Sequence, residues 1–171
     1  MVMGKGGVGK TTVAAALAVA LAARGRSVHL STTDPAAHLA DTLHGSLPGL
    51  SVDRIDPQAE TARYVEKVMA TRGKGLSEAE QALMREDLRS PCTEEVAVFH
   101  AFSRTVASSR SAFVVLDTAP TGHTLLLMDA TGAYHRQMVR ELSPGTSHLT
   151  TPLMRLQDPA HTHVLLVTLP E

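Results

Sequence analysis

Residues 4–12 read Gly4-Lys5-Gly6-Gly7-Val8-Gly9-Lys10-Thr11-Thr12, and an apolar, alanine-rich stretch follows them directly. These residues fit the Walker A spacing, Gly-x4-Gly-Lys-Thr, at the start of a helix. Glycines let the backbone fold around phosphates with its N–H groups inward, and the N-terminus of the helix adds a positive dipole. The stretch therefore predicts a nucleotide-binding loop to which all nine residues, Gly4 to Thr12, contribute.

Three side chains of this loop are predicted to carry its chemistry. Lys10 would neutralise the β- and γ-phosphates of the nucleotide, and the Thr11 hydroxyl would bind Mg²⁺. Lys5 is a second lysine inside the loop, which marks the deviant subclass of Walker A loops. In that subclass this lysine contacts phosphates, often across a dimer interface, and we count it with Lys10 among the catalytic residues. The alternative for Lys5 is an ordinary solvated lysine.

Predicted strands and helices alternate along the rest of the chain. Strands are expected for residues 27–31, 50–55, 112–117 and 163–169, and helices for residues 13–24, 57–72, 93–108 and 124–140, with one more helix opened by a capping-box pattern at Ser77. This alternation predicts an α/β fold of the P-loop NTPase type, a doubly wound and mostly parallel sheet with helices on both faces. The whole chain, 1–171, is expected to be a single domain.

Two carboxylates lie at or just beyond the ends of predicted strands. Because ligands bind at the carboxyl ends of parallel strands, Asp34 and Asp117 would both face a bound nucleotide. Asp34 would orient the attacking water or hold the Mg²⁺ shell, unless it only caps a helix begun by Pro35. Asp117 fits a Walker B aspartate, which holds Mg²⁺ through water. The predicted Mg²⁺ site is therefore Thr11, Asp34 and Asp117, and the catalytic carboxylate is Asp34.

Composition excludes several other classes of protein. The chain has 171 residues, of which 43% are apolar, and its 16 Lys and Arg nearly balance 17 Asp and Glu. A disordered chain is excluded by the apolar fraction, and a nucleic-acid partner is not expected without a basic excess. The longest apolar run, residues 13–23, is about half of what a membrane span needs. A single cysteine without a recognisable signal peptide makes the cytoplasm the expected compartment.

Three motifs together resemble one known family. The run DTAPTGHT (117–124), with KGGVGKTT (5–12) and TDPAAHL (33–39), resembles the arsenical pump-driving ATPases (ArsA) and their eukaryotic relatives that target tail-anchored proteins. Residues 89–95 and 126–134 look like the C-terminal one of the two homologous ArsA halves. The resemblance implies an ATPase that uses ATP and Mg²⁺ and is stimulated by As(III) or Sb(III). It also implies a homologous half or second subunit as a partner, and an arsenite efflux permease that holds the protein peripherally at the inner membrane.

The same resemblance places a metalloid ligand at Cys92, with Ser90 and His123 nearby in the same role. Pro91 is expected to begin a helix, which would put the Cys92 thiol near the positive end of the helix dipole and favour the thiolate. Arsenite and antimonite are soft ions that prefer thiolates. One cysteine cannot fill a three-thiolate site, so further ligands would come from another half or subunit. The alternative for Cys92 is that it is a small, buried apolar residue, as a lone cysteine often is.

The two ends of the sequence carry a further expectation. Only three residues precede Gly4, and the chain stops directly after a predicted strand. We expect the first strand and the C-terminal part, with the adenine-contacting residues, to be missing from a fragment of a larger protein. Two other functions remain open: a targeting ATPase for tail-anchored membrane proteins, and a nucleotide-binding remnant without activity.

Overall fold

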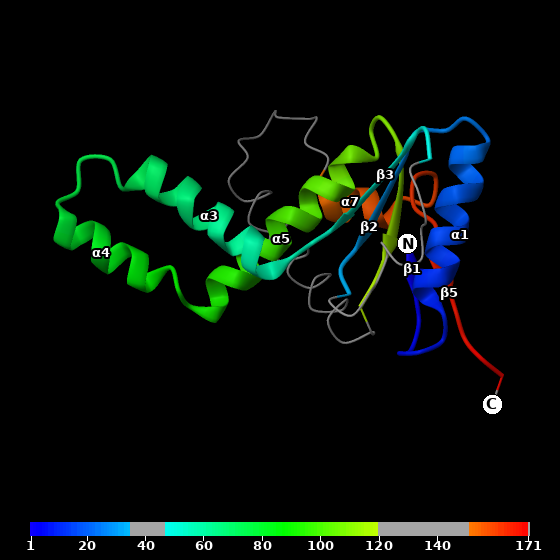
Figure 1. Ribbon diagram of the computed structural model, residues 1–171, viewed down its shortest axis with the longest axis horizontal. Coiled ribbons are helices and arrows are strands. Elements are labelled where there is room, and N and C mark those ends of the chain that lie inside the picture. The colour runs from blue at the N-terminus through cyan, green and yellow to red at the C-terminus, as the bar shows by residue number, and fades with distance from the viewer. Residues whose placement is uncertain (35–46, 120–150, 171) are drawn as a thin grey trace. The chain divides into compact units, whose positions relative to one another are not determined.

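The computed structural model describes residues 1–34, 47–119 and 151–170 (Figure 1). These residues fall into two compact units, one formed by Met1–Arg54 and Ser103–Glu171 and the other by Ile55–Phe102. Among the described residues, no helix is both long enough and apolar enough to cross a membrane.

A five-stranded sheet with all of its described pairs parallel forms the centre of the first unit. Its strands are β1 (Val2–Met3), β2 (Val28–Thr32), β3 (Leu50–Arg54), β4 (Phe113–Asp117) and β5 (Leu165–Leu166), in the order β3-β2-β4-β1-β5. The predicted α/β P-loop NTPase fold is confirmed. The strands predicted over 27–31, 50–55 and 112–117 each lie within one residue of an observed strand.

Strand β1 corrects the expectation that the strand before the glycine loop is absent. Val2 and Met3 form a strand that pairs with β4 on one side and with β5 on the other. Val2 is completely buried, and its carbonyl oxygen accepts a hydrogen bond of 2.7 Å from the Thr118 hydroxyl. Two residues are too few for a sequence period, so sheet pairing alone reveals this strand.

Helix α1 (Lys10–Ala23) covers one face of the sheet. Apart from Lys10 at its start, the buried positions of this helix are alanines, whose small side chains let the helix backbone approach the strands closely. These alanines pack against buried residues of the strands and form the hydrophobic core with them. The core residues are Val2, Ala14, Ala15, Ala18, Ala22, Val28, Leu30 and Val115. The helix ends before Gly25, where φ is 74° and the amide donates to the Ala22 carbonyl oxygen. A residue with a side chain is strained at that φ, so glycine is favoured at the position that ends the helix.

The other face of the sheet carries α7 (Pro152–Gln157) and the end of α5 (Pro91–Ser108). The crossover from β1 to β2 and the crossover from β3 to β4 run in opposite directions along the sheet. Right-handed crossovers of opposite direction place their helices on opposite faces. Figure 1 shows α1 and α7 on either side of the strands. Arg155 of α7 donates to the hydroxyl of Ser109, just after α5, over 3.2 Å.

At the last strand the structure differs from the sequence prediction. A strand is predicted over residues 163–169, and its apolar run favours burial, but β5 contains only Leu165 and Leu166, which are 41% and 74% exposed. Among the described residues, β5 is an edge strand, so its apolar side chains are less covered than those of β4. The helix predicted over residues 124–140 lies outside the described residues.

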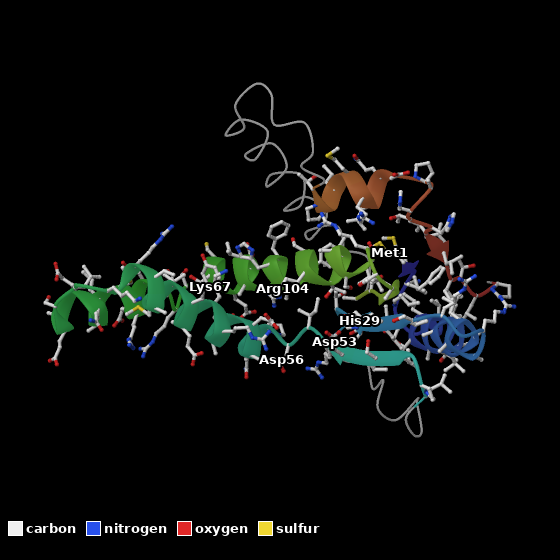
Figure 2. All side chains as sticks on the ribbon, turned by 90° about the horizontal axis from the view of Figure 1, so that it is seen from above. Met1, His29, Asp53, Asp56, Lys67 and Arg104 are labelled. Carbon is white, nitrogen blue, oxygen red and sulfur yellow. The ribbon has the colours of Figure 1, made fainter. Side chains whose placement is uncertain are left out.

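The second unit consists of α3 (Pro57–Arg72), α4 (Glu78–Asp87) and the first turns of α5. The bounds of α3 are those predicted, because Asp56 caps it by accepting from two backbone amides and Pro57 begins its first turn (Figure 2). The capping box of Ser77 and Glu80 at α4 is also confirmed. Those hydrogen bonds from Ser77 lower the pKa of the Glu80 carboxyl.

Candidate nucleotide-binding site

The glycine loop connects β1 to α1 at the carboxyl end of the sheet. Gly9 is the N-cap of α1 and has φ 91° and ψ 22°, a left-handed conformation that favours glycine. Lys10 and Thr11 occupy the first two helical positions, and Thr12 follows them. The loop residues Lys5, Gly6 and Gly7 are exposed, so the loop presents its backbone to solvent. This is the arrangement that the Walker A spacing predicts.

Lys10 is held inside the loop. Its side chain is nearly buried, with the whole residue 5% exposed, and its ammonium group donates to the Lys5 carbonyl oxygen over 3.1 Å. Its charge also acts on Asp117, whose pKa it lowers. Lys10 is therefore hydrogen-bonded to the loop backbone and close enough to the carboxylate at the end of β4 to act on it electrostatically, where a phosphate chain would need a positive charge.

Asp117 is the central carboxylate of the site and is completely buried. Its Oδ2 accepts hydrogen bonds from two hydroxyls, Thr11 Oγ1 at 2.8 Å and Thr32 Oγ1 at 3.1 Å. Its Oδ1 is buried and has no hydrogen-bond partner among the described residues. Burial raises the pKa of Asp117 above its ordinary value, against the lowering effect of the two hydroxyls, and the nearby Asp34 raises it further.

These features fit a magnesium ion. A buried carboxylate oxygen without a donor lies on the same side chain as an oxygen bonded to the Thr11 hydroxyl, and Mg²⁺ prefers oxygen ligands. Over the described part of the chain, no three His, Cys, Asp or Glu residues gather as a metal cage. Mg²⁺ does not need one, since it is usually bound by one or two carboxylates together with substrate phosphates.

Asp34 lies two residues beyond the end of β2, at the same edge of the sheet. Its backbone amide donates to Thr32 Oγ1 over 3.0 Å, and its negative charge raises the pKa of Asp117. The structure therefore brings together four of the predicted residues, Lys10, Thr11, Asp34 and Asp117. The helix predicted to start at Pro35 lies outside the described residues, so the capping alternative for Asp34 is untested.

The predicted metalloid residues are found elsewhere or not described. Cys92 is a free thiol, exposed, at the second residue of α5, and Pro91 begins that helix as predicted. Its exposure contradicts the alternative of a buried apolar cysteine. Ser90 lies beside it, with its hydroxyl hydrogen-bonded to Thr93 Oγ1 at 3.1 Å. His123 lies outside the described residues, so the metalloid role of the three stays a prediction.

Sequence reasoning missed two groups of residues at the site. Thr32 and Thr33 connect the ends of β2 and β4: Thr32 bonds Asp117, and the Thr33 hydroxyl accepts from the Ala119 amide over 3.1 Å. The second group is the segment after β5, which together with the glycine loop lines a cavity of about 480 Å³; the lining residues are Gly4 to Val8 and Leu166 to Pro170. A signal for the first group is present in the sequence. In the run Ser31-Thr32-Thr33-Asp34, three hydroxyl residues directly precede a candidate catalytic carboxylate.

Gly4 offers a test of this contact between the loop and the segment after β5. A Cβ on Gly4 would collide with the Val167 carbonyl oxygen, whereas a Cβ on Gly7 would meet nothing within 4 Å. Both residues have positive φ, 151° and 77°, so alanine is strained at either one. Gly4→Ala is therefore expected to lower the free energy of unfolding by about 2 kcal/mol more than Gly7→Ala. Urea unfolding of the two variants measures this, and equal losses would contradict the contact.

A loop of this shape on a parallel sheet, a lysine at the first helical position and a carboxylate at the end of the adjacent strand define a P-loop NTPase. The family model described as anion-transporting ATPase matches residues 1–164, and the chain belongs to this family. Arsenical pump-driving ATPases of Escherichia coli and Acidiphilium multivorum are 64% and 63% identical to it over all 171 residues. ATPase GET3 of Malassezia globosa is 34% identical over an alignment of 154 residues that covers 84% of this chain and 45% of that protein.

These comparisons confirm the resemblance to the arsenical pump-driving ATPases. The chain spans 29% of the length of the Escherichia coli and Acidiphilium multivorum relatives.

Proposed function

We propose that this chain is an ATP-hydrolysing module that energises the efflux of arsenite or antimonite. The observation that carries hydrolysis is the pairing of Thr11 with Asp117 at 2.8 Å, with the second oxygen of that buried carboxylate left without a partner. The identity of 64% to an arsenical pump-driving ATPase, over every residue of the chain, supports the efflux role.

Each residue of the site has a part in this chemistry. The loop backbone and Lys10 bind the phosphates of ATP and offset their negative charge. Thr11 and Asp117 would hold Mg²⁺, with Asp34 either in its surroundings or aligning the water that attacks the γ-phosphate. Bound Mg²⁺ supplies charge neutralisation on the phosphate oxygens. Catalysis of this kind depends on position and electrostatics rather than on a covalent step.

A homologous half or a second subunit completes the proposed enzyme. The exposed Lys5 on the loop supports this, because a lysine held outward can reach a nucleotide bound to another copy of the fold. The chain then acts as one half of a two-half ATPase, and the half that it resembles is the C-terminal half of ArsA. Its location is the cytoplasm, at the inner membrane, where an arsenite permease recruits it.

Metalloid binding at Cys92, with Ser90 and His123, is proposed to activate hydrolysis. The support is the exposed thiol at the start of α5, with the Ser90 hydroxyl on the residue before Pro91. As(III) or Sb(III) bound there would also take ligands from the other half and stabilise the closed arrangement of the two. A ligand that binds one arrangement better than the other shifts the population toward it.

Replacing Cys92 by serine tests this gating. Cys92→Ser is expected to weaken activation by antimonite about tenfold, equivalent to about 1.4 kcal/mol of coupling, because a hydroxyl is a poor ligand for a soft ion. The measurement is steady-state ATPase rate against antimonite concentration in the full-length protein, relative to the metalloid-free rate of each variant. Glu95→Gln, an exposed change in the same helix, is the control and should activate normally.

A second candidate is a targeting ATPase for tail-anchored membrane proteins, which the similarity to ATPase GET3 keeps open. Unchanged activation by antimonite in Cys92→Ser would favour it. The third candidate is a nucleotide-binding remnant without activity. Its premise that the strand before the loop is missing does not hold, because β1 pairs with β4 and β5, and an assay of ATP hydrolysis by this chain decides whether it is active.

A further inference from the structure

Thr32 occupies a special place beside the buried carboxylate. It is the last residue of β2, it is completely buried, and it is the register partner of Asp117 across the parallel pair β2–β4. Partners in register on neighbouring strands share a face of the sheet, while successive residues of one strand alternate between faces. Thr32 therefore faces the Asp117 side chain, and Ser31 points to the opposite face.

The Thr32 hydroxyl joins two candidate functional residues. It donates a hydrogen bond to Asp117 Oδ2 over 3.1 Å and accepts a hydrogen bond from the backbone amide of Asp34 over 3.0 Å. Since Thr11 Oγ1 donates to the same Oδ2 over 2.8 Å, two hydroxyls fix one oxygen of the carboxylate. The other oxygen, Oδ1, is left without a protein partner among the described residues.

A general role in packing does not account for this pattern. Ser31, the neighbouring residue, is equally buried, yet its hydroxyl has no partner within the described ranges, so this sheet tolerates an unbonded hydroxyl. The ends of β2 and β4 are also held together without Thr32: the Thr33 amide donates to the Asp117 carbonyl oxygen over 2.9 Å, and the Ala119 amide donates to Thr33 Oγ1 over 3.1 Å. Losing the Thr32 hydroxyl would thus remove one of the two hydrogen bonds that hold the carboxylate and leave the strands joined.

We infer that Thr32 is a positioning residue of the hydrolytic site. Its hydroxyl orients the Asp117 carboxylate so that Oδ1 remains available to the magnesium–nucleotide complex, and it ties the Asp34 backbone to the same carboxylate. This inference rests on the proposed function, since it assigns Thr32 a part in that reaction. In this role Thr32 acts through Asp117 and Asp34, the two residues that its hydroxyl contacts, and not through a contact of its own with nucleotide or metal.

The test compares three variants of the full-length protein: Thr32→Val, which removes the hydroxyl at nearly constant volume, Thr32→Ser, which keeps it, and Ser31→Ala, the matched control. Isothermal titration calorimetry with a non-hydrolysable ATP analogue, with Mg²⁺ and with EDTA, measures the gain in affinity that Mg²⁺ provides. This gain is expected to fall about tenfold in Thr32→Val, because a hydrogen bond to a charged group is lost. Thr32→Ser and Ser31→Ala should keep it within about threefold.

Steady-state kinetics supply the second readout. In Thr32→Val the half-saturating Mg²⁺ concentration should rise about tenfold, and kcat at saturating Mg²⁺ should fall because the Asp34 amide has lost its acceptor. Thermal unfolding checks that each variant is folded. If Thr32→Val does not fold, Thr32→Ala and Thr32→Ser differ by the hydroxyl alone and decide the question in the same way.

The outcomes separate this inference from the proposed function. An undiminished Mg²⁺ effect in Thr32→Val, or an equal loss in Ser31→Ala, overturns the role of Thr32 while leaving the ATPase proposal intact. A wild-type protein that neither binds nor hydrolyses ATP overturns the proposed function, and the role of Thr32 with it.

Discussion

Lys10→Ala is expected to abolish measurable ATP hydrolysis, with a loss of at least about a hundredfold in kcat/KM. Lys10 is the one buried lysine or arginine among the described residues, and its ammonium group lies 3.1 Å from the Lys5 carbonyl oxygen of the loop. Alanine leaves the β- and γ-phosphates without that charge at the point where the loop would enclose them. The measurement is steady-state phosphate release by the full-length protein.

A second measurement shows whether the loss arises from nucleotide contacts or from damage to the fold. Added nucleotide raises the unfolding temperature of a protein that binds it in the native state. The wild-type protein should show this rise and Lys10→Ala should show little of it, while their unfolding temperatures without nucleotide stay close. Lys74→Ala removes an exposed lysine outside the loop and should behave as wild type in both measurements. Near-normal turnover in Lys10→Ala would remove the loop from the mechanism.

Elements with a local signal were predictable from the sequence. The bounds of α3 follow from Asp56 and Pro57 at its start, because capping and a fixed φ depend on neighbours in the chain. The spacing of the glycine loop places Lys10 and Thr11 on the first turn of α1 for the same reason. Asp117 is the last residue of strand β4, and the apolar character of that strand is also readable from its own residues.

Elements that depend on distant partners were not predictable in the same way. Thr32 and Asp117 are 85 positions apart, and only the register of β2 against β4 brings the hydroxyl to the carboxylate. Strand β1 is two residues long, so pairing with its neighbours defines it. The exposure of Leu166 follows from the edge position of β5 in the described sheet, whereas its apolar sequence favoured a buried strand.

Asp34→Asn is expected to reduce kcat by about a hundredfold or more, while the affinity for the magnesium complex of a non-hydrolysable analogue changes by no more than about threefold. Asparagine keeps the shape of the side chain and the backbone amide that donates to Thr32, so the local structure should persist. It removes the negative charge that would accept a proton from the attacking water. A loss confined to kcat therefore reports on chemistry and not on binding.

The alternative role of Asp34 predicts a different result from the same variant. If this carboxylate belongs to the surroundings of Mg²⁺, the affinity for the magnesium complex should fall together with kcat, while the affinity measured in EDTA stays near that of the wild type. Asp53→Asn is the matched control, because Asp53 lies on the neighbouring strand β3 and pairs with His29 at 3.5 Å (Figure 2). Both kinetic constants should remain normal in that control.

The charge of Asp34 raises the pKa of the buried Asp117, so removing that charge should ease ionisation of Asp117. A fall in magnesium affinity would then have to come from Asp34 itself, which makes the split between kcat and affinity a direct measure of its role.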